Sequence, residues 1–389
     1  MLKNRRNWLI RSAVVCLLVS LLLSMPCVAC GETTLPFIRI DRDNPDYWQG
    51  ELSSVRLIAG QLYELQEMDA ESGVDPDFMP SEEGMDTLCI SGSAQFSVPQ
   101  FRELASSLRE CAGDRTVYVF DLRQESHGLV NEGIPLSWYG THNWANEGMT
   151  LEEVEADESE RLGAMIGSTI KAYARKGETP IEPPLVISVE SVMTEKELVE
   201  SEGFEYIRLP MRDHSWPTAE TIDTFVSFVK SIDPDQSWLH FHCMGGRGRT
   251  GVMMMIYDMM MNPDVPMQDI AVRQAMTGSG YALYTEDSDS YKVPLYEEKV
   301  RMTPLFYEYV QQNCESNYDV PWSVWLEEQE ALPPAFNIVS SAKSESSKGP
   351  QIVDRWGRFL PVLFRPCSSA RSFRSLFSFS QFVWCIVSR

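Results

Sequence analysis

The stretch that decides the fold is Trp238-Leu-His-Phe-His-Cys-Met-Gly-Gly-Arg-Gly-Arg-Thr250. Residues 238–242 form a short apolar and aromatic run, which predicts a buried strand. The three glycines after Cys243 predict a tightly curved loop, and the apolar residues from Thr250 to Met261 predict a helix. The six methionines of that helix are interpreted as core filling rather than as a metal or peptide site.

Strand and helix patterns alternate on either side of this stretch. Thr116–Leu122 and Glu205–Leu209 are rich in β-branched and aromatic residues, which predicts two further strands. Helices are predicted over Gln100–Arg109 and Thr218–Ile232, each with a proline at or just before its start. Strands that alternate with helices indicate an α/β fold with a mostly parallel central sheet flanked by helices.

Residues from about 130 to 202 interrupt this rhythm. Several prolines, a helix predicted over about 151–175 and a strand-like run at Leu185–Val189 indicate a small inserted β-rich subdomain. The expected division is a signal peptide (1–29), the N-terminal part of the core (30–129), the inserted subdomain (130–202), the C-terminal part of the core (203–335) and a basic, aromatic tail without predicted structure (336–389).

The composition and charge of the chain limit its function. With 389 residues and 43% hydrophobic residues, the chain can bury a large core. Its net charge is −23, and because the first 29 and last 47 residues are basic, residues 30–342 carry −33. This balance argues against nucleic acid as a partner. Oligomeric state cannot be predicted.

The N-terminal segment is typical of an exported protein. Four basic residues precede an apolar stretch from about Ala13 to Leu23, and small residues follow near Ala29, which is the layout of a secretory signal. Cys30 follows a sequence similar to a lipoprotein cleavage box, so a periplasmic, a secreted and a membrane-tethered lipoprotein form are the alternatives. The nine cysteines show no zinc-ligand spacing, and we expect no metal and no cofactor.

The loop after residue 242 has the chemistry of an anion site. Met244, Gly245, Gly246, Arg247 and Gly248 are predicted to direct backbone N–H groups inward, next to the positive end of the helix. Those groups would stabilise a thiolate, which makes Cys243 a candidate nucleophile. Arg249 can clamp a phosphoryl group, and the hydroxyl of Thr250 can donate to the sulfur when the thiolate leaves.

A candidate general acid lies one strand earlier in the chain. Asp213 stands in the loop between the second strand and the helix at 218–232, flanked by Arg212 and His214, which are predicted to lie near the substrate. A carboxylic acid at this place could protonate a leaving alkoxide and then activate water. A loop carboxylate without a catalytic role is the alternative, and the nearby Cys loop favours the acid.

These residues resemble the cysteine-dependent tyrosine phosphatases and, more closely, the bacterial tyrosine-phosphatase-like phytases. The likeness includes Asp121-Leu-Arg-Gln-Glu-Ser-His-Gly128, Asn143-Trp-Ala-Asn146 and Asp213-His-Ser-Trp-Pro217 and runs from about residue 78 to 330. It implies a phosphatase core with a small β-rich domain and metal-independent hydrolysis of myo-inositol polyphosphates. A tyrosine phosphatase and a silent phosphate-binding module are the alternatives.

The resemblance leaves two questions about the site. Asp121, Arg123 and His127 either contact the substrate or form a buried network that supports the site. The stretch that is lysine-rich in the family is acidic here, from Tyr284 to Tyr291, and Lys292 is its nearest base. The identity of the substrate therefore depends on the remaining basic residues.

Overall fold

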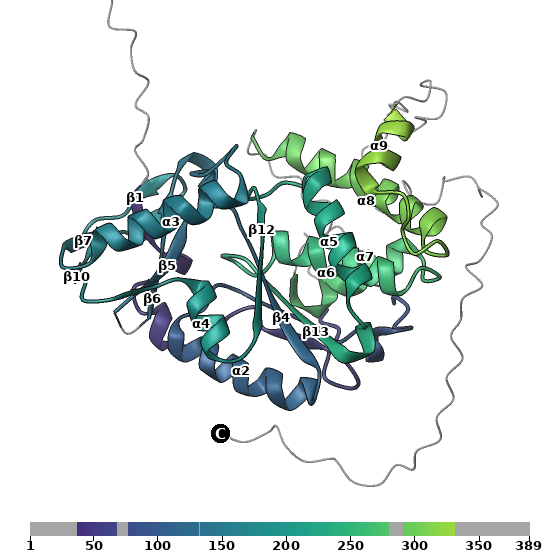
Figure 1. Ribbon diagram of the computed structural model, residues 1–389, viewed down its shortest axis with the longest axis horizontal. Helices are drawn as coiled ribbons and strands as arrows, with labels where there is room; N and C mark the ends of the chain where they lie inside the picture. The colour runs from purple at the N-terminus through teal and green to yellow at the C-terminus, as the bar shows by residue number, and fades with distance from the viewer. Residues whose placement is uncertain (1–36, 68–76, 132, 280–290, 331–389) are drawn as a thin grey trace, which may run out of the picture.

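The computed structural model describes residues 37–67, 77–131, 133–279 and 291–330, and its elements form a larger and a smaller unit (Figure 1). The larger unit is built on a five-stranded sheet, in the order β12-β4-β13-β3-β2. Its strands are β12 (Glu205–Met211), β4 (Thr116–Arg123), β13 (Ser237–His242), β3 (Ile90–Ser93) and β2 (Arg56–Ile58). Only β2 pairs antiparallel, so the predicted α/β fold with a mostly parallel sheet is confirmed.

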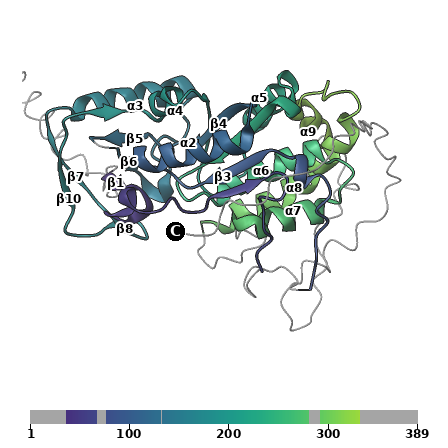
Figure 2. The same ribbon diagram turned by 90° about the horizontal axis from the view of Figure 1, so that it is seen from below.

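Helices cover both faces of this sheet, because its strands are apolar on both sides. Along β4, Phe120 and Leu122 pack on one side, with α5 (Ala219–Ser231), α6 (Gly248–Met261) and the helices that follow. Val117 and Val119 of the same strand pack on the other side, with α2 (Val98–Ala112) and α4 (Glu195–Ser201). Figure 2 shows α2 and α4 above β3, and α7 (Met267–Gln274) and α8 (Val293–Asn313) below it.

The helix boundaries follow the capping residues. The hydroxyl of Ser97 accepts from the backbone N–H of Gln100, and α2 begins at Val98, two residues before the predicted start at Gln100. Thr218 caps α5 through the N–H of Thr221. The helix after the Cys loop begins at Gly248, two residues before the predicted start at Thr250.

The smaller unit is β-rich. Its four-stranded antiparallel sheet has the order β1 (Phe37–Ile40), β6 (Ile134–Tyr139), β5 (His127–Val130) and β11 (Val192–Met193). Two hairpin-like pairs complete it: β7 (Thr169–Ala172) with β10 (Leu185–Ser188), and β8 (Arg175–Lys176) with β9 (Thr179–Pro180). Leu162 and Met165 of α3 (Leu151–Met165) pack into its core.

Two sequence expectations differ from the arrangement of this unit. The helix predicted to reach residue 175 ends at Met165, because Gly167 adopts a positive φ of 75° and the alternating residues 169–172 then pair as β7. The second sheet also takes β1 and most of β5 from outside 130–202, because Phe37–Ile40 pairs with β6. The expected signal peptide (1–29) and tail (336–389) lie outside the described residues.

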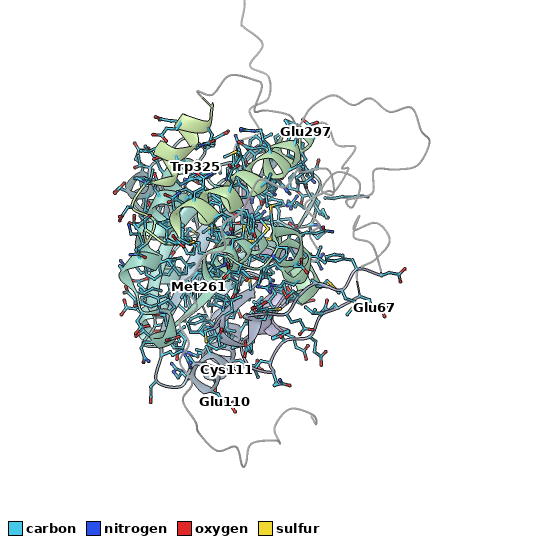
Figure 3. All side chains as sticks on the ribbon, turned by 90° about the vertical axis from the view of Figure 1, so that its right-hand side faces the viewer. Glu67, Glu110, Cys111, Met261, Glu297 and Trp325 are labelled. Atoms are coloured by element: carbon cyan, nitrogen blue, oxygen red, sulfur yellow. The ribbon has the colours of Figure 1, made fainter. Side chains whose placement is uncertain are left out.

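The C-terminal helices close the larger unit. Trp322 and Trp325 of α9 (Trp322–Glu330) stack with ring centroids 5.6 Å apart and contact Tyr309 of α8. Figure 3, which views this side, labels Trp325 on α9 and Met261 at the end of α6. Within the described ranges, no helix combines the length and the apolar character needed to span a membrane.

Phe120 tests the importance of the central sheet for stability. Its ring is fully buried, with the rings of Phe228 and Phe241 at 5.1 and 4.9 Å. We expect Phe120→Ala to lower the free energy of unfolding by about 3–5 kcal/mol, as measured by urea denaturation. Val186→Ala is the control, because Val186 is 60% exposed and should change stability by less than about 0.5 kcal/mol. Equal effects of the two variants would contradict this description of the core.

Candidate active site

The functional side chains follow the carboxyl ends of four parallel strands. Cys243 comes directly after β13, while Asp213, Glu125 and Gln95 each stand two residues after the ends of β12, β4 and β3. Parallel strands place their carboxyl ends at one edge of the sheet, which is where sites collect in α/β folds. The topology therefore brings together residues that are far apart in sequence.

The Cys loop is curled so that its amide groups face one side. The carbonyl of Met244 accepts from the N–H of Gln95 at 3.2 Å, that of Gly245 from the hydroxyl of Ser54 at 3.2 Å, and that of Gly246 from Arg56 at 2.7 Å. In a trans peptide the N–H points opposite to the carbonyl. Since these three carbonyls are bound from behind, the N–H groups of residues 245–247 face the opposite side, as an anion cradle requires.

Gly246 is required for this curl. Its φ is +69°, and a Cβ there would lie 2.5 Å from the backbone N of Ala94 and from the carbonyl carbon of Ser93. Both atoms belong to the backbone that leaves β3, so neither can move aside without disturbing the sheet. Only glycine fits at this position.

Cys243 lies at the base of the cradle and is 3% exposed. The hydroxyl of Thr250, in the first turn of α6, donates to its sulfur over 3.2 Å. Because the helix begins at Gly248, its positive end also faces this region. The sulfur therefore has a hydroxyl donor and a helix N-terminus that favour negative charge on it.

Arg249 is fixed by a buried carboxylate. Its two Nη atoms donate to the carboxylate of Glu125 at 2.7 and 3.1 Å, and Nη1 also donates to the carbonyl of Met211. Burial acts to lower the pKa of Arg249, but Asp213 and Glu125 outweigh it and raise that pKa. Nε makes no hydrogen bond among the described residues, so this nitrogen remains available to a phosphoryl oxygen.

Asp213 faces Arg249 from the loop after β12. Its Oδ1 lies 3.4 Å from Nε of Arg249, and its Oδ2 accepts from the amide of Asn143 at 2.9 Å. Burial raises the pKa of Asp213, but the charge of Arg249 and the neighbouring His214 outweigh it, so the pKa lies below its ordinary value. The carboxyl group that sequence analysis assigns as general acid is therefore ionised before an anion binds.

The remaining predicted site residues form the rim. Met244, Gly245 and Gly248 are partly exposed in the loop, and the side chain of Arg247 is exposed. The ring of His214 lies near that of Tyr291. Burial lowers the pKa of His214, and the charge of Lys292 lowers it further, although Asp213 acts to raise it. Arg212 extends to Glu147 over 2.7 Å and lies across the ring of Trp144.

Asp121, Arg123 and His127 do not lie at the rim. They are 0%, 0% and 1% exposed. Arg123 donates to Asp41 and Glu125 at 2.7 and 2.9 Å, and Asp121 accepts from the hydroxyl of Tyr206. All three side chains therefore belong to a buried network, which is the alternative to substrate contact that the sequence leaves open.

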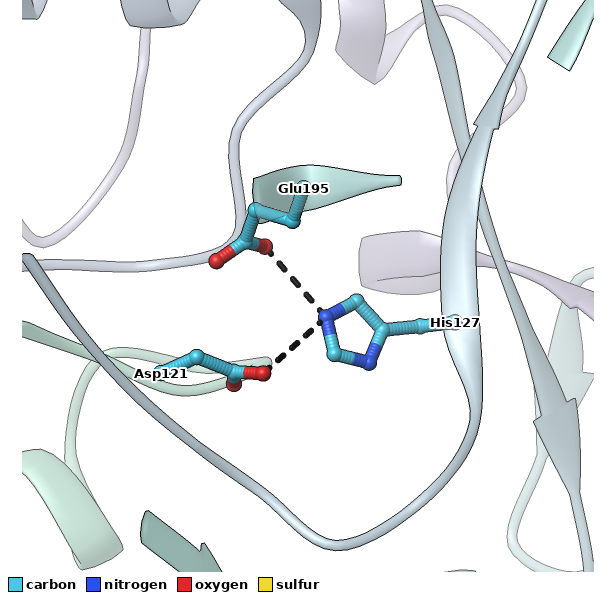
Figure 4. A group of neighbouring side chains, drawn as sticks. All are labelled: Asp121, His127 and Glu195. Carbon is cyan, nitrogen blue, oxygen red and sulfur yellow. Dashed lines mark ion pairs between the residues drawn. The ribbon is translucent and has the colours of Figure 1, made fainter. Parts of the chain in front are cut away.

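Part of that network has the composition of a metal site. Figure 4 shows His127 between Asp121 and Glu195, with Nε2 at 3.4 Å from Oδ2 of Asp121 and 3.3 Å from Oε2 of Glu195. Both oxygens already receive protein donors, from Arg208 at 3.1 Å and from Gln95 at 2.7 Å.

The charge balance of this group favours a proton rather than a metal ion. Burial and Arg123 lower the pKa of His127, but the carboxylates of Asp121, Glu158 and Glu195 outweigh them and raise it. An imidazolium fits between two carboxylates, so His127 itself supplies the positive charge. Within the described residues we therefore assign these side chains to support of the site.

No sequence pattern predicted the roles of several residues that support the site. Glu125 and Asn143 stand inside the quoted motifs, yet their roles depend on contacts across 124 and 70 residues. Arg56 supports the Cys loop from β2, and burial lowers its pKa to about 10. Lys299 of α8 is 3% exposed and close enough to Asp213 and Cys243 for their charges to affect it.

Lys299 gives the site a testable pH dependence. Burial lowers its pKa to about 8, so its side chain is cationic below this pH and neutral above it. Sulfate keeps its charge over this range and serves as the anion. In a Cys243→Ser background, which removes the thiol group, we expect sulfate binding measured by calorimetry to weaken about three- to tenfold from about pH 7 to about pH 9. Adding Lys299→Met should abolish this dependence. If the double variant keeps the same pH dependence, Lys299 is not its cause.

Comparisons with known proteins agree with this geometry. The family model for tyrosine-phosphatase-like phytases, described as "Inositol hexakisphosphate", matches residues 120–261. The structure of the myo-inositol phosphatase from Mitsuokella multacida, in complex with myo-inositol-(1,3,4,5)-tetrakisphosphate, is 36% identical with a TM-score of 0.66, and the match covers 75% of this chain and 49% of that chain. A phytase structure from Bdellovibrio bacteriovorus is 29% identical with a TM-score of 0.52, over 72% of this chain and 97% of that chain.

A curated relative has a different description. The "Effector protein hopD2" of Pseudomonas syringae pv. tomato is 29% identical over 248 residues, which cover 62% of this chain and 52% of the relative. The chain thus spans about half the length of this relative and of the Mitsuokella protein. On the family model and the two solved structures, residues 120–261 carry the domain of the tyrosine-phosphatase-like phytase family, and the chain shares the fold of that family.

Proposed function

We propose that this protein is a phosphatase that removes phosphate groups from myo-inositol polyphosphates through a cysteinyl-phosphate intermediate. The observation that carries the proposal is the buried Cys243 sulfur, 3.2 Å from the Thr250 hydroxyl, below a loop whose amides face one side. The solved Mitsuokella relative was determined with an inositol tetrakisphosphate, which supports this class of substrate.

The first step transfers the phosphoryl group to sulfur. The Cys243 thiolate attacks phosphorus, and the bond between phosphorus and the ester oxygen breaks as the S–P bond forms. The loop amides and Arg249 bind the equatorial oxygens, where negative charge is spread in the transition state. The leaving alkoxide takes the proton of Asp213.

Binding of the substrate can cause Asp213 to take up this proton from the solvent. In the free site Arg249 holds the pKa of Asp213 below its ordinary value. A phosphoryl dianion that binds Arg249 offsets this positive charge and adds negative charge beside Asp213, so the pKa of the carboxyl group rises on binding. Asp213 therefore becomes protonated in the complex that needs an acid.

The second step hydrolyses the intermediate. Asp213, now ionised, accepts a proton from water as the water oxygen attacks phosphorus. The S–P bond breaks, and the hydroxyl of Thr250 donates to the departing thiolate over the contact seen in the free site. Inorganic phosphate is released, and Cys243 and Asp213 return to their starting states.

The charge around the loop suits a substrate with several phosphates. Arg42 and Arg56 lie behind the loop carbonyls, at 3.5 Å from Gly245 O and 2.7 Å from Gly246 O, and Arg247 is exposed at the loop itself. Screening over about 8 Å at physiological salt limits the effect of distant acidic residues. These local cations therefore outweigh the net charge of −23 once the substrate is bound.

An aromatic cluster beside the acid loop favours a second candidate, a protein tyrosine phosphatase. The rings of His142 and Tyr291 stack with centroids 3.6 Å apart, and Trp144 and His214 lie edge-on to Tyr291 at 6.0 and 6.2 Å. Such rings could pack against the ring of a phosphotyrosine. The similarity to an effector protein supports the same alternative, with proteins of a host as substrates.

A comparison of kcat/KM for the two kinds of substrate distinguishes these functions. We expect phosphate release from phytate in the presence of EDTA, with kcat/KM at least about tenfold above that for phosphotyrosine peptides. Cys243→Ser should retain only a trace of activity, and substantial activity in that variant would contradict the cysteinyl-phosphate mechanism. A preference for phosphotyrosine peptides would establish the second candidate. Tight phytate binding without turnover by the wild type would instead indicate a silent phosphate-binding module.

We also propose that the protein is exported, in a periplasmic, secreted or lipid-anchored form, on the basis of residues 1–29 and of Cys30. These residues lie outside the described ones. Fractionation of cells that express the full chain should place it outside the cytoplasm, whereas deletion of residues 2–29 should retain it there. Labelling with palmitate that is lost in Cys30→Ser would identify the lipid-anchored form. A cytoplasmic full-length chain would contradict export.

A further inference from the structure

The amide of Asn143 lies between two carboxylates of the site. Its Nδ2 donates to Oε1 of Glu125 at 3.0 Å and to Oδ2 of Asp213 at 2.9 Å. Glu125 fixes the clamp Arg249, and Asp213 is the proposed general acid. A single side chain, only 4% exposed, therefore links the two groups on which phosphoryl transfer depends.

The orientation of this amide is fixed from behind. Its oxygen accepts from Nη1 of Arg39 at 3.1 Å, and Arg39 donates in turn to Ser137 at 3.1 Å and to Asp41 at 3.3 Å. A flipped amide would place its oxygen against two carboxylates and its NH2 group against a guanidinium, so only the observed orientation satisfies all partners. The NH2 group must therefore face Glu125 and Asp213.

The segment that carries Asn143 also grips the acid loop at a second point. The indole N–H of Trp144 donates to the carbonyl of Asp213 at 3.1 Å. This segment follows β6 of the smaller unit, and His142 and Asn143 both adopt positive φ angles, 57° and 67°. Asparagine tolerates this conformation better than most residues. The smaller unit thus contacts both the backbone and the side chain of the acid.

We propose that Asn143 is a positioning residue that holds the carboxyl group of Asp213 in the orientation that proton transfer needs. Its amide binds Oδ2, while Oδ1 accepts from the backbone N–H of His214 at 3.1 Å. With both oxygens held, the carboxyl group keeps its orientation, and Oδ1 stays 3.4 Å from Nε of Arg249, beside the place of the bound phosphoryl group. This inference rests on the proposed role of Asp213 as general acid.

Loss of this amide should change catalysis in two recognisable ways. Without a donor on Oδ2 the carboxyl group can rotate away from the leaving oxygen, so transfer to a poor leaving group slows, while a good leaving group needs little help from an acid. The amide also stabilises the ionised form and contributes to the lowered pKa of Asp213. Its removal should raise that pKa and move the high-pH limb of kcat to higher pH.

The test compares two aryl phosphates and does not depend on the physiological substrate. Phenyl phosphate has a poor leaving group and p-nitrophenyl phosphate a good one. Asn143→Gly removes the amide without strain at a positive φ, and Asn143→Asp replaces its donor with an acceptor. We expect both variants to lose about ten- to hundredfold in kcat for phenyl phosphate and less than about threefold for p-nitrophenyl phosphate. The high-pH limb should move upward in both.

Asn146→Ala is the matched control. Asn146 is a buried amide of the same segment that binds Ser126 and Asp157 and makes no hydrogen bond to Asp213. Its variant should affect both substrates equally. Equal losses on both substrates in the Asn143 variants, an unmoved pH limb, or the same leaving-group dependence in Asn146→Ala would each overturn the positioning role.

A further variant separates this inference from the proposed function. Asp213→Asn should show a still larger difference between the two aryl phosphates, because it lacks the acid altogether. If Asp213→Asn shows no such difference, Asp213 is not the general acid, and both the proposed mechanism and the role of Asn143 fail. If Asp213→Asn shows the difference but the Asn143 variants do not, only the positioning role fails.

Discussion

The buried ion pair between Arg249 and Glu125 is the interaction on which the site depends. It joins the first turn of α6 to the segment after β4, and Arg249 also reaches the carbonyl of Met211 at the end of β12. Two charges removed from water are costly unless their hydrogen bonds are complete. Glu125 meets this condition through Arg249, Arg123 and Asn143. Burial raises its pKa, but the charges of Arg249 and Arg123 outweigh this effect and hold that pKa well below the ordinary value. The position of the clamp is therefore coupled to the ends of β4 and β12.

The same ionic layer extends through both units. Asp41, which follows β1, accepts from Arg123 of β4 and from Arg39, while Glu158 of α3 accepts from Arg208 of β12. Because the buried acids and bases are shared, the two sheets cannot shift relative to each other without leaving charges unpaired. A rigid relation between them is what allows Asn143, which belongs to the smaller unit, to fix a carboxyl group of the larger one.

The sequence predicts this molecule well where the deciding information is local. The strand, loop and helix around Cys243 depend on neighbouring residues. Local patterns failed at Met165, where a glycine turn ends α3, and at β1, whose place is set by pairing with β6. Chemistry was predicted for Cys243, Arg249 and Asp213 by residue type and resemblance. Their supports were not, because Glu125, Asn143 and Arg56 acquire a role only through contacts across 124, 70 and 190 residues.

The contact between Arg56 and the carbonyl of Gly246 has a consequence for how the chain reaches its final shape. The two residues are separated by 190 positions, and Arg42 contacts Gly245 across 203. Contacts of this separation close late, since the entropy of the intervening loop must be lost first. During synthesis the Cys loop emerges long after the segments that support it. Until then the charged side chains of those segments, which are buried in the folded protein, remain in water. We therefore expect the cradle to form late in folding, once the segments that support it are in place, rather than as a local nucleus around which the protein is built.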